Sequence, residues 1–217
     1  MNRIYKLLLI IIYFVSILQG TTILAGDEKS GEMIQKLKSK YDKLKTLQAD
    51  FVQIAYWKLA DNSHEQKGSI WLKGTEKFKI ETQDQAITAN GTTLWTFSGF
   101  NQQVIIENMT KSKDVSLPRD LFLTYSEQYQ SSYIGEELVD NDNCHVIYLT
   151  GKTDDLFIKT IKIWISMKLW MPVKIEQQDL NSNKNTYLLK NIQLDEPIPD
   201  AFFNYTLPDS VEIIDMR

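Results

Sequence analysis

The side chains that could act as a nucleophile, a general base or a metal ligand are few in this sequence. It contains one cysteine and two histidines, and Cys144 directly precedes His145 in a segment with strand character. Neighbouring residues of a strand point to opposite faces, so Cys144 and His145 are not expected to form a nucleophile–base pair. His64 falls in a predicted turn. We expect a structural cysteine, no internal disulfide and no enzyme active site.

Two short segments resemble ion-binding loops without completing them. Residues 151–153 (GKT) look like the end of a phosphate-binding loop, but Val146 stands where that loop needs its first glycine. Asp140, Asp142 and Asn143 could suggest calcium, yet the segment lacks the central glycine and the distal glutamate of such a site. Both segments are predicted to be turns between strands. We therefore expect no metal site and no cofactor.

Aromatic side chains are abundant and the net charge is acidic. The chain has 9 Phe, 10 Tyr and 5 Trp, with a formal net charge of −4. Aromatic residues fill ordinary cores, but they also line apolar ligand cavities. An acidic balance argues against nucleic acid and against anionic membrane surfaces, since both select basic patches. Apolar or basic partners are favoured.

The N-terminus has the layout of a secretory signal peptide. Arg3 and Lys6 precede an apolar run from residue 7 to residue 18. The run is shorter than the roughly 20 residues that a spanning helix needs. We expect cleavage after Ala25, with a cut after Gly20 as the alternative. The predicted organisation is a signal peptide over 1–25 and a single domain over 26–217, exported and monomeric.

The expected elements are mainly strands. Apolar residues at spacings of three and four predict an amphipathic helix over 30–47, and Pro118 opens a second, short helix over 117–125. Elsewhere, short β-rich runs alternate with turn residues, which predicts ten or eleven strands that pair antiparallel. Between Lys77 and Glu81 charged and apolar residues alternate, so Phe78 and Ile80 are predicted to share a dry face.

Four segments in the same order resemble the outer-membrane lipoprotein carrier family, LolA. They are a lysine-rich helix running into an "A-x-F-x-Q" strand (37–53), a "G-x-L-W" strand (68–73), a "D-G-x-x-L-W-x-Y" hairpin (90–97) and an "F-x-F-x-P-x-G-V" ending (202–211). The resemblance covers about residues 32–216. It implies an α+β, mainly β fold: an incomplete, unclosed antiparallel β-barrel of about 11 strands with a helical lid.

The resemblance also implies a function. The family carries acylated lipoproteins from the inner to the outer membrane by shielding their acyl chains in an apolar cavity. Its implied partners are an inner-membrane LolCDE-type ABC transporter and, where present, an outer-membrane LolB-type receptor. Together with strand parity it suggests twelve lipid-binding candidates: Leu37, Tyr41, Phe51, Ile70, Leu72, Phe78, Ile80, Trp95, Phe97, Leu121, Phe122 and Ile163.

One position departs from the family pattern, and several readings stay open. Family members carry arginine and proline just after the "G-x-L-W" strand, where this chain has Gly74 and Thr75. The arginine is thought to hold the lid closed, so here Lys73 or Lys77 is expected to do so, or the lid is held less firmly. A glycolipid carrier, an RseB-like lipid-sensing module and a small lipid or glycan hydrolase are the alternatives.

Overall fold

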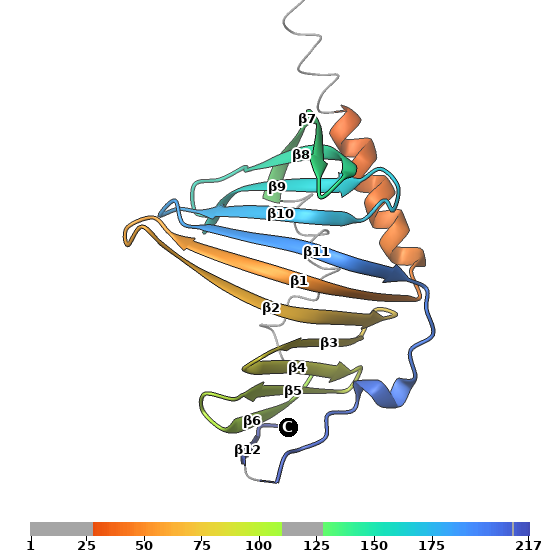
Figure 1. Ribbon diagram of the computed structural model, residues 1–217, viewed down its shortest axis with the longest axis vertical. Helices are drawn as coiled ribbons and strands as arrows, with labels where there is room; N and C mark the ends of the chain where they lie inside the picture. Colours follow the sequence, from red (N-terminus) through yellow and green to blue (C-terminus); the bar gives the residue numbers. More distant parts are fainter. Residues whose placement is uncertain (1–27, 110–127, 210) are drawn as a thin grey trace, which may run out of the picture.

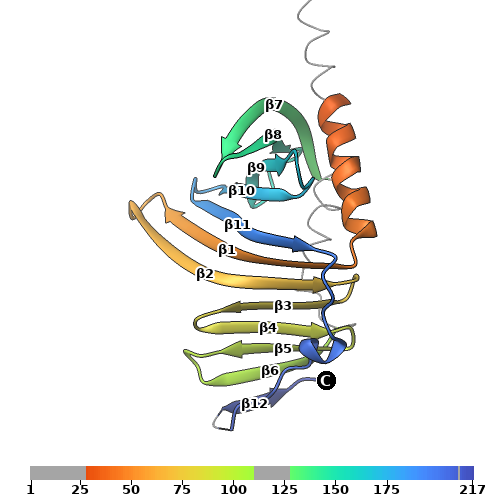
Figure 2. The ribbon, with the colours of Figure 1, turned by 45° about the vertical axis from the view of Figure 1, so that its right-hand side comes forward.

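The computed structural model describes residues 28–109, 128–209 and 211–217. Twelve strands form one sheet in the order β12-β6-β5-β4-β3-β2-β1-β11-β10-β9-β8-β7. The sheet is unclosed, with β12 and β7 as its two edges, and it curls toward the N-terminal helix (Figures 1 and 2). The expected incomplete barrel with mainly β content is confirmed.

The strands are long in the middle of the sheet and short toward β6. Their bounds are β1 Thr46–Trp57, β2 Asn62–Lys73, β3 Lys77–Thr82, β4 Gln85–Asn90, β5 Thr93–Ser98, β6 Gln103–Asn108, β7 Tyr129–Val139, β8 Asp142–Gly151, β9 Ile158–Ser166, β10 Pro172–Asp179, β11 Lys184–Leu194 and β12 Glu212–Asp215, with a 3₁₀ turn, η1, at Asp200–Phe203.

Turn chemistry explains why the chain reverses where it does. Asp140 and Asn141 between β7 and β8 both have positive φ, 46° and 66°. This pair of left-handed residues matches the twist of a two-residue hairpin, and Asp and Asn tolerate it better than most side chains. The segment that could have suggested calcium is therefore a hairpin turn.

The N-terminal helix is shorter at its C-terminal end than the periodicity predicted. Residues 28–43 are helical, whereas β1 already begins at Thr46. Leu47 therefore belongs to the sheet, where it is 3% exposed and packs with Ala49 and Met171. The apolar spacing of three and four residues extended to Leu47 by coincidence. Leu47 lies three residues after Leu44 and faces the same core, but it does so from a strand. The predicted second helix, 117–125, lies outside the described residues.

The C-terminus corrects one further expectation. Adjacent strands pair antiparallel throughout the described sheet except for β12, which pairs parallel with β6, Ile213 opposite Val104. A long connection that contains η1 leads from the end of β11 to β12, which lies beside β6 (Figure 1). A connection of that length permits a parallel pairing, which short turns forbid.

The register separates the side chains of the sheet into two faces. We call inner the face that carries Leu47, Phe51, Ile70, Phe78 and Ile163, and outer the opposite face. The N-terminal helix packs on the inner face, where its buried residues join those of β7, β8 and β9 in one core cluster: Met33, Leu37, Tyr129, Ile147, Leu149, Ile161, Ile163 and Ile165.

Candidate functional site

An apolar band runs along the inner face from β10 to β4. Phe51, Ile70 and Ile80 are only partly buried. Ile70 and Ile80 each pack against a core cluster, and Phe51 lies opposite Leu189 of β11. The register carries this surface across six strands, from Ile175 in β10 through Phe51 in β1 to Ile87 in β4. We name as the inner apolar band the half-buried residues Phe51, Ile70, Leu72, Ile80, Ile87, Ile175 and Leu189.

Phe51 is positioned by a glycine on the neighbouring strand. Gly68 lies opposite Phe51 in the β1–β2 register. A Cβ atom at Gly68 would lie only 2.6 Å from Cζ of the Phe51 ring, so the ring occupies the space that any side chain at 68 would need. The absence of a side chain at Gly68, the glycine of the "G-x-L-W" segment, therefore allows the Phe51 ring to lie over the neighbouring strand.

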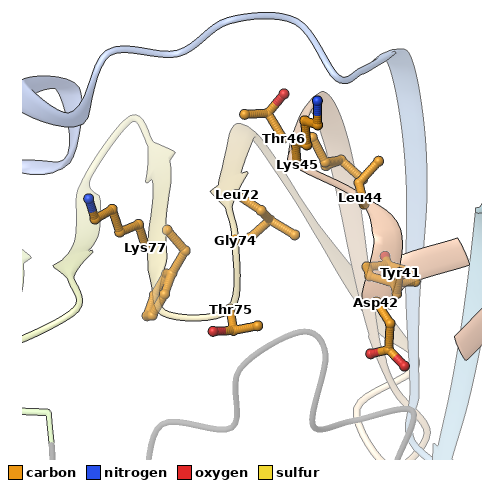
Figure 3. A pocket seen from close by; sticks show the side chains of 11 residues that line it. Tyr41, Asp42, Leu44, Lys45, Thr46, Leu72, Gly74, Thr75 and Lys77 are labelled. Atoms are coloured by element: carbon orange, nitrogen blue, oxygen red, sulfur yellow. The ribbon is translucent and has the colours of Figure 1, made fainter. Parts of the chain in front are cut away.

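A small pocket opens where the helix meets this band. It has a volume of about 80 Å³, and Figure 3 shows Tyr41 and Leu44 on one side and Leu72 and Thr75 on the other. Ligand pockets typically measure about 300–1,000 Å³. In this conformation the pocket cannot hold an acyl chain. Its full lining is Tyr41, Asp42, Leu44, Lys45, Thr46, Leu47, Leu72, Gly74, Thr75, Lys77 and Phe78.

The helix is held to the sheet by polar and aromatic contacts as well as by its core. Nζ of Lys36 lies 3.3 Å from the centroid of the Trp170 ring, and Nζ of Lys29 lies 3.6 Å from that of Tyr133. Ser30 and Ser131 share a hydrogen bond of 2.8 Å between their hydroxyls. Each contact joins the helix to β7 or to the β9–β10 turn.

His145 lies beneath these contacts on the inner face. Its Nδ1 atom lies 3.3 Å from the Tyr133 hydroxyl and 3.7 Å from Oε1 of Glu136, and its ring is 5.5 Å from that of Trp170. Burial lowers the pKa of His145, and the charges of Lys29 and Lys36 lower it further, while Glu136 raises it. The imidazole is therefore held neutral under the helix.

Lys73 and Lys77, the expected lid holders, bind elsewhere. Their Nζ atoms lie 2.6 and 2.8 Å from the carboxylate of Asp200 in η1, and Lys73 also donates to the carbonyl of Ile198. The hydrogen bonds from Lys73 and Lys77 to the Asp200 carboxylate lower its pKa to about 2. The lysines fasten the C-terminal segment to the sheet, and within the described residues neither ammonium group contacts the helix.

The predicted site residues divide into five groups, of which Trp95 and Phe97, described below, form the last. Phe51, Ile70, Leu72 and Ile80 belong to the inner apolar band. Leu37, Phe78 and Ile163 face inward too but are closed into core clusters, at most 3% exposed. Tyr41 lines the pocket, and burial raises the pKa of its phenol. Leu121 and Phe122 lie outside the described residues.

Trp95 and Phe97 do not join the inner apolar band. The register places them on the outer face, since their neighbour Leu94 pairs with the inner-face Ala89. There the Phe97 ring stacks with Tyr205 at 6.4 Å. Their strand was assigned correctly, but the alternation in 93–98 is ambiguous, because apolar residues occupy both parities. The missed band residues, Ile87, Ile175 and Leu189, are single apolar positions that only the register aligns.

Cys144 and His145, the residues best suited to covalent catalysis, do not face one another. Cys144 is fully buried on the outer face, and burial raises the pKa of its thiol to about 11. His145 lies on the inner face, as the alternation predicted.

Residues 28–109, 128–209 and 211–217 contain no group of three or more His, Cys, Asp or Glu that could hold a metal ion. No helix in the same residues has the length and apolar character of a membrane span.

A second hollow lies on the outer face and is polar. It is lined by Gln48, Asp50, Asn191, Ile192 and Gln193. The Asp50 carboxylate accepts hydrogen bonds from Ser69 (2.8 Å) and Asn191 (2.7 Å), which lower its pKa. A carboxylate satisfied in this way braces the strands and is poorly suited to act as a base.

Solved structures share this architecture. An uncharacterized conserved protein from Thermus thermophilus superposes with a TM-score of 0.58 at 10% identity, over 86% of this chain and 99% of that one. A chain of the Pseudomonas aeruginosa MucA/MucB complex superposes with a TM-score of 0.53 at 10% identity, over 82% of this chain and 61% of that one. At such identities the likeness concerns the fold alone.

Relatives in sequence are distant but extensive. An outer-membrane lipoprotein carrier protein of Francisella tularensis subsp. novicida is 25% identical over 195 residues, 87% of this chain and 88% of that protein. An uncharacterized protein of Methanocaldococcus jannaschii is 22% identical over 186 residues, 84% of this chain and 53% of that protein, so the chain spans about half of its length. The family model described as outer membrane lipoprotein carrier protein LolA matches residues 42–206. Since that match covers most of the chain, the chain belongs to the LolA family.

Proposed function

We propose that this protein is a carrier that shields the acyl chains of lipoproteins on the inner apolar band. The observation that carries the proposal is the band itself: seven apolar side chains, only half-buried, aligned across the sheet beside a helix. Water-exposed acyl chains cost about 0.8 kcal/mol per methylene, so cargo with several chains needs a surface of this kind. Membership of a carrier family supports the same role.

Loading requires the helix to move. The pocket of about 80 Å³ is too small for an acyl chain, and the helix borders it. Separation of residues 28–43 from β7 and the β9–β10 turn would extend the pocket along the inner apolar band.

The route and the partners belong to the same proposal. Residues 1–25 act as a signal peptide that directs the chain to the periplasm, where it diffuses between the membranes. Lifting acylated cargo out of a bilayer needs energy, which we assign to an inner-membrane LolCDE-type transporter. A LolB-type receptor takes the cargo where such a receptor exists. The protein performs no covalent chemistry.

Binding can be tested with one charge on the band and one off it. Ile80→Glu places a carboxylate against acyl chains, at a cost of roughly 2.5–3.5 kcal/mol. Binding of a fluorescent fatty acid should therefore need about a hundredfold higher protein concentration. Lys67→Glu is the matched control, since Lys67 is exposed on the outer face of β2. Phe78 is less suitable, because it is closed into a core cluster.

Two further outcomes decide the proposal. Circular dichroism and a thermal melt must report the same fold for both variants, and Ile80→Ser provides a milder change at the same position. Equal fatty-acid binding by the folded Ile80→Glu and Lys67→Glu proteins would refute the band as the binding surface. Depletion of the protein should strand outer-membrane lipoproteins at the inner membrane, which fractionation detects.

The second candidate is a lipid-sensing module of the RseB kind, and the likeness to the MucA/MucB complex favours it. A carrier for glycolipid or another amphiphile is a third. Native mass spectrometry of the protein recovered from its host separates these cases from the lipoprotein carrier. An acylated peptide bound to the protein supports the carrier, whereas a bound glycolipid, or normal lipoprotein sorting after depletion, contradicts it.

A further inference from the structure

Five large apolar side chains stand exposed at one end of the sheet. The strand directions place the β1–β2, β3–β4, β5–β6, β8–β9 and β10–β11 turns together at that end, on the left in Figure 1. Leu59 is 101% exposed and Phe100 is 95% exposed, so both side chains extend fully into solvent. We call this end of the sheet the hairpin edge, defined by the exposed residues Trp57, Leu59, Phe100, Phe157 and Leu180.

The opposite end of the sheet is different. Its short turns carry Gly74 and Thr75 between β2 and β3, Gly91 between β4 and β5, and Asp140 and Asn141 between β7 and β8. Among the described hairpins at that end, none exposes a large apolar side chain at its tip. Scattered exposed apolar residues are ordinary on protein surfaces, but four of five hairpins at one end and none at the other is a directional arrangement.

Two turns of the hairpin edge have internal hydrogen bonds that satisfy some of their polar groups. In the β10–β11 turn the Asp179 carboxylate accepts hydrogen bonds from the backbone N–H groups of Asn181 (2.8 Å) and Asn183 (2.9 Å). In the β5–β6 turn the Gln102 side chain donates to the carbonyl of Gly99 at 2.6 Å. These turns present apolar side chains outward with part of their backbone already paired, which lowers the cost of leaving water.

Three of the turns are also joined to one another. The N–H of Leu180 donates to the carbonyl of Phe157 at 3.0 Å, and the N–H of Lys58 donates to the side chain of Asn183 at 3.0 Å. The tips of the β1–β2, β8–β9 and β10–β11 hairpins are therefore held at fixed positions relative to each other. No ordering of loops is needed before they act together.

We propose that the hairpin edge docks on the surface of a lipid bilayer. Each tip carries a single apolar side chain or a pair, separated from the next by polar turn residues, whereas a protein partner of standard size needs a continuous patch of about 800 Å². A fluid bilayer accepts separate side chains, and tryptophan such as Trp57 favours its interface. The inference goes beyond the carrier function, since it holds for whatever the inner apolar band binds.

The charges at the edge specify the type of bilayer. The β1–β2 and β8–β9 turns carry Lys58 and Lys152 against Asp61, Asp154 and Asp155, and the β5–β6 turn, 99–102, carries no charge. Without an excess of positive charge, anionic lipid gives no added attraction. Docking should occur on neutral phosphatidylcholine and phosphatidylethanolamine vesicles and should withstand added salt.

Vesicle flotation tests the proposal with a matched pair of variants. The double variant Leu59→Ser, Phe100→Ser should lower the partition of the protein onto neutral vesicles about a hundredfold, roughly tenfold for each side chain. Both side chains are solvent-exposed, so folding should be unaffected. Leu138→Ser removes an equally apolar exposed side chain (65% exposed) near the other end of the sheet and should leave partition unchanged. All proteins must carry the same N-terminus, verified by sequencing.

A single dye provides an independent readout. Cys144 is buried, so a new exposed cysteine can be labelled selectively. Leu180→Cys carrying an environment-sensitive fluorophore should shift to the blue on neutral vesicles, and Leu138→Cys should not. The double variant should bind the fluorescent fatty acid with normal affinity. This result separates the present inference from the proposed function. Equal flotation of all variants, no flotation of the unmodified protein, or binding that requires anionic lipid and disappears in salt would overturn it.

Discussion

Nζ of Lys36 in the N-terminal helix lies 3.3 Å from the centroid of the Trp170 ring in the β9–β10 turn. Trp170 has a positive φ of 52°, an uncommon conformation for a bulky residue, and its ring lies between Lys36 of the helix and His145. The aromatic face attracts the ammonium group, and the contact is worth about 0.5–1 kcal/mol at an exposed site. The contact joins the helix to the β9–β10 turn, away from Gly74, the position where the resemblance to the family implies a lid-holding arginine.

Lys36→Gln should therefore loosen the helix without unfolding the sheet. Helix propensity hardly changes, so the lost free energy of about 1 kcal/mol should appear as roughly fivefold faster hydrogen exchange of the amides in residues 33–43. Lys43→Gln, on an exposed position of the same helix, is the control and should exchange at the normal rate. Identical exchange in both variants would show that the cation–π contact contributes nothing to docking.

Acidification should weaken the same region through His145. Its pKa in the folded protein is lowered below 6.5, chiefly by burial, so the unfolded chain binds the proton more readily. The stabilising contribution is fully present above about pH 6.5 and is lost as the pH falls toward the folded pKa. Denaturant unfolding at pH 8 and pH 5 should show a larger loss of stability in the unmodified protein than in His145→Gln. The same loss in both proteins would exclude His145 as its source.

Gly68→Ala should displace the Phe51 ring and destabilise the sheet. An added Cβ meets both the ring and the backbone carbonyl of Glu81, so a strand must shift, at an expected cost of about 2 kcal/mol or more. The free energy of unfolding in denaturant measures it. Gly31→Ala in the helix provides the contrast: apart from the adjoining residues and backbone of the helix itself, no described atom lies within 4 Å of the added Cβ, and helix propensity predicts a gain of up to about 1 kcal/mol. Similar effects of the two substitutions would contradict the close approach.

Thr88→Val should stabilise the protein. Thr88 is fully buried, and its Oγ1 is a buried side-chain atom without a hydrogen-bond partner in the described structure. Replacing the hydroxyl with a methyl group of similar shape removes a desolvation penalty of about 1 kcal/mol. Thr88→Ser keeps the hydroxyl and loses the methyl group, so it should destabilise by a similar amount. Thermal melts of the two variants moving in the same direction would argue against an unsatisfied hydroxyl.

The local pattern of the sequence determined which side chains share a face. Alternation between Lys77 and Glu81 places Phe78 and Ile80 together because strand geometry has a period of two, whatever the partner strand. The same rule separated Cys144 from His145, and turn residues marked most hairpins. Four ordered segments identified the family, and one of their features, the glycine at 68, corresponds to the close approach of Phe51 to that position.

Only the tertiary structure decided what covers each face. Lys79, on the charged side of its strand, has its Nζ 4.8 Å from the centroid of the Phe202 ring, because the C-terminal segment folds over the outer face. That contact spans more than a hundred residues, and no local period encodes it. In the same segment Asp200 forms ion pairs with Lys73 and Lys77, and β12 pairs parallel with β6. Long-range pairing also brings single apolar positions into one band and separate turn tips to one edge, because sheet register aligns residues that the sequence keeps far apart.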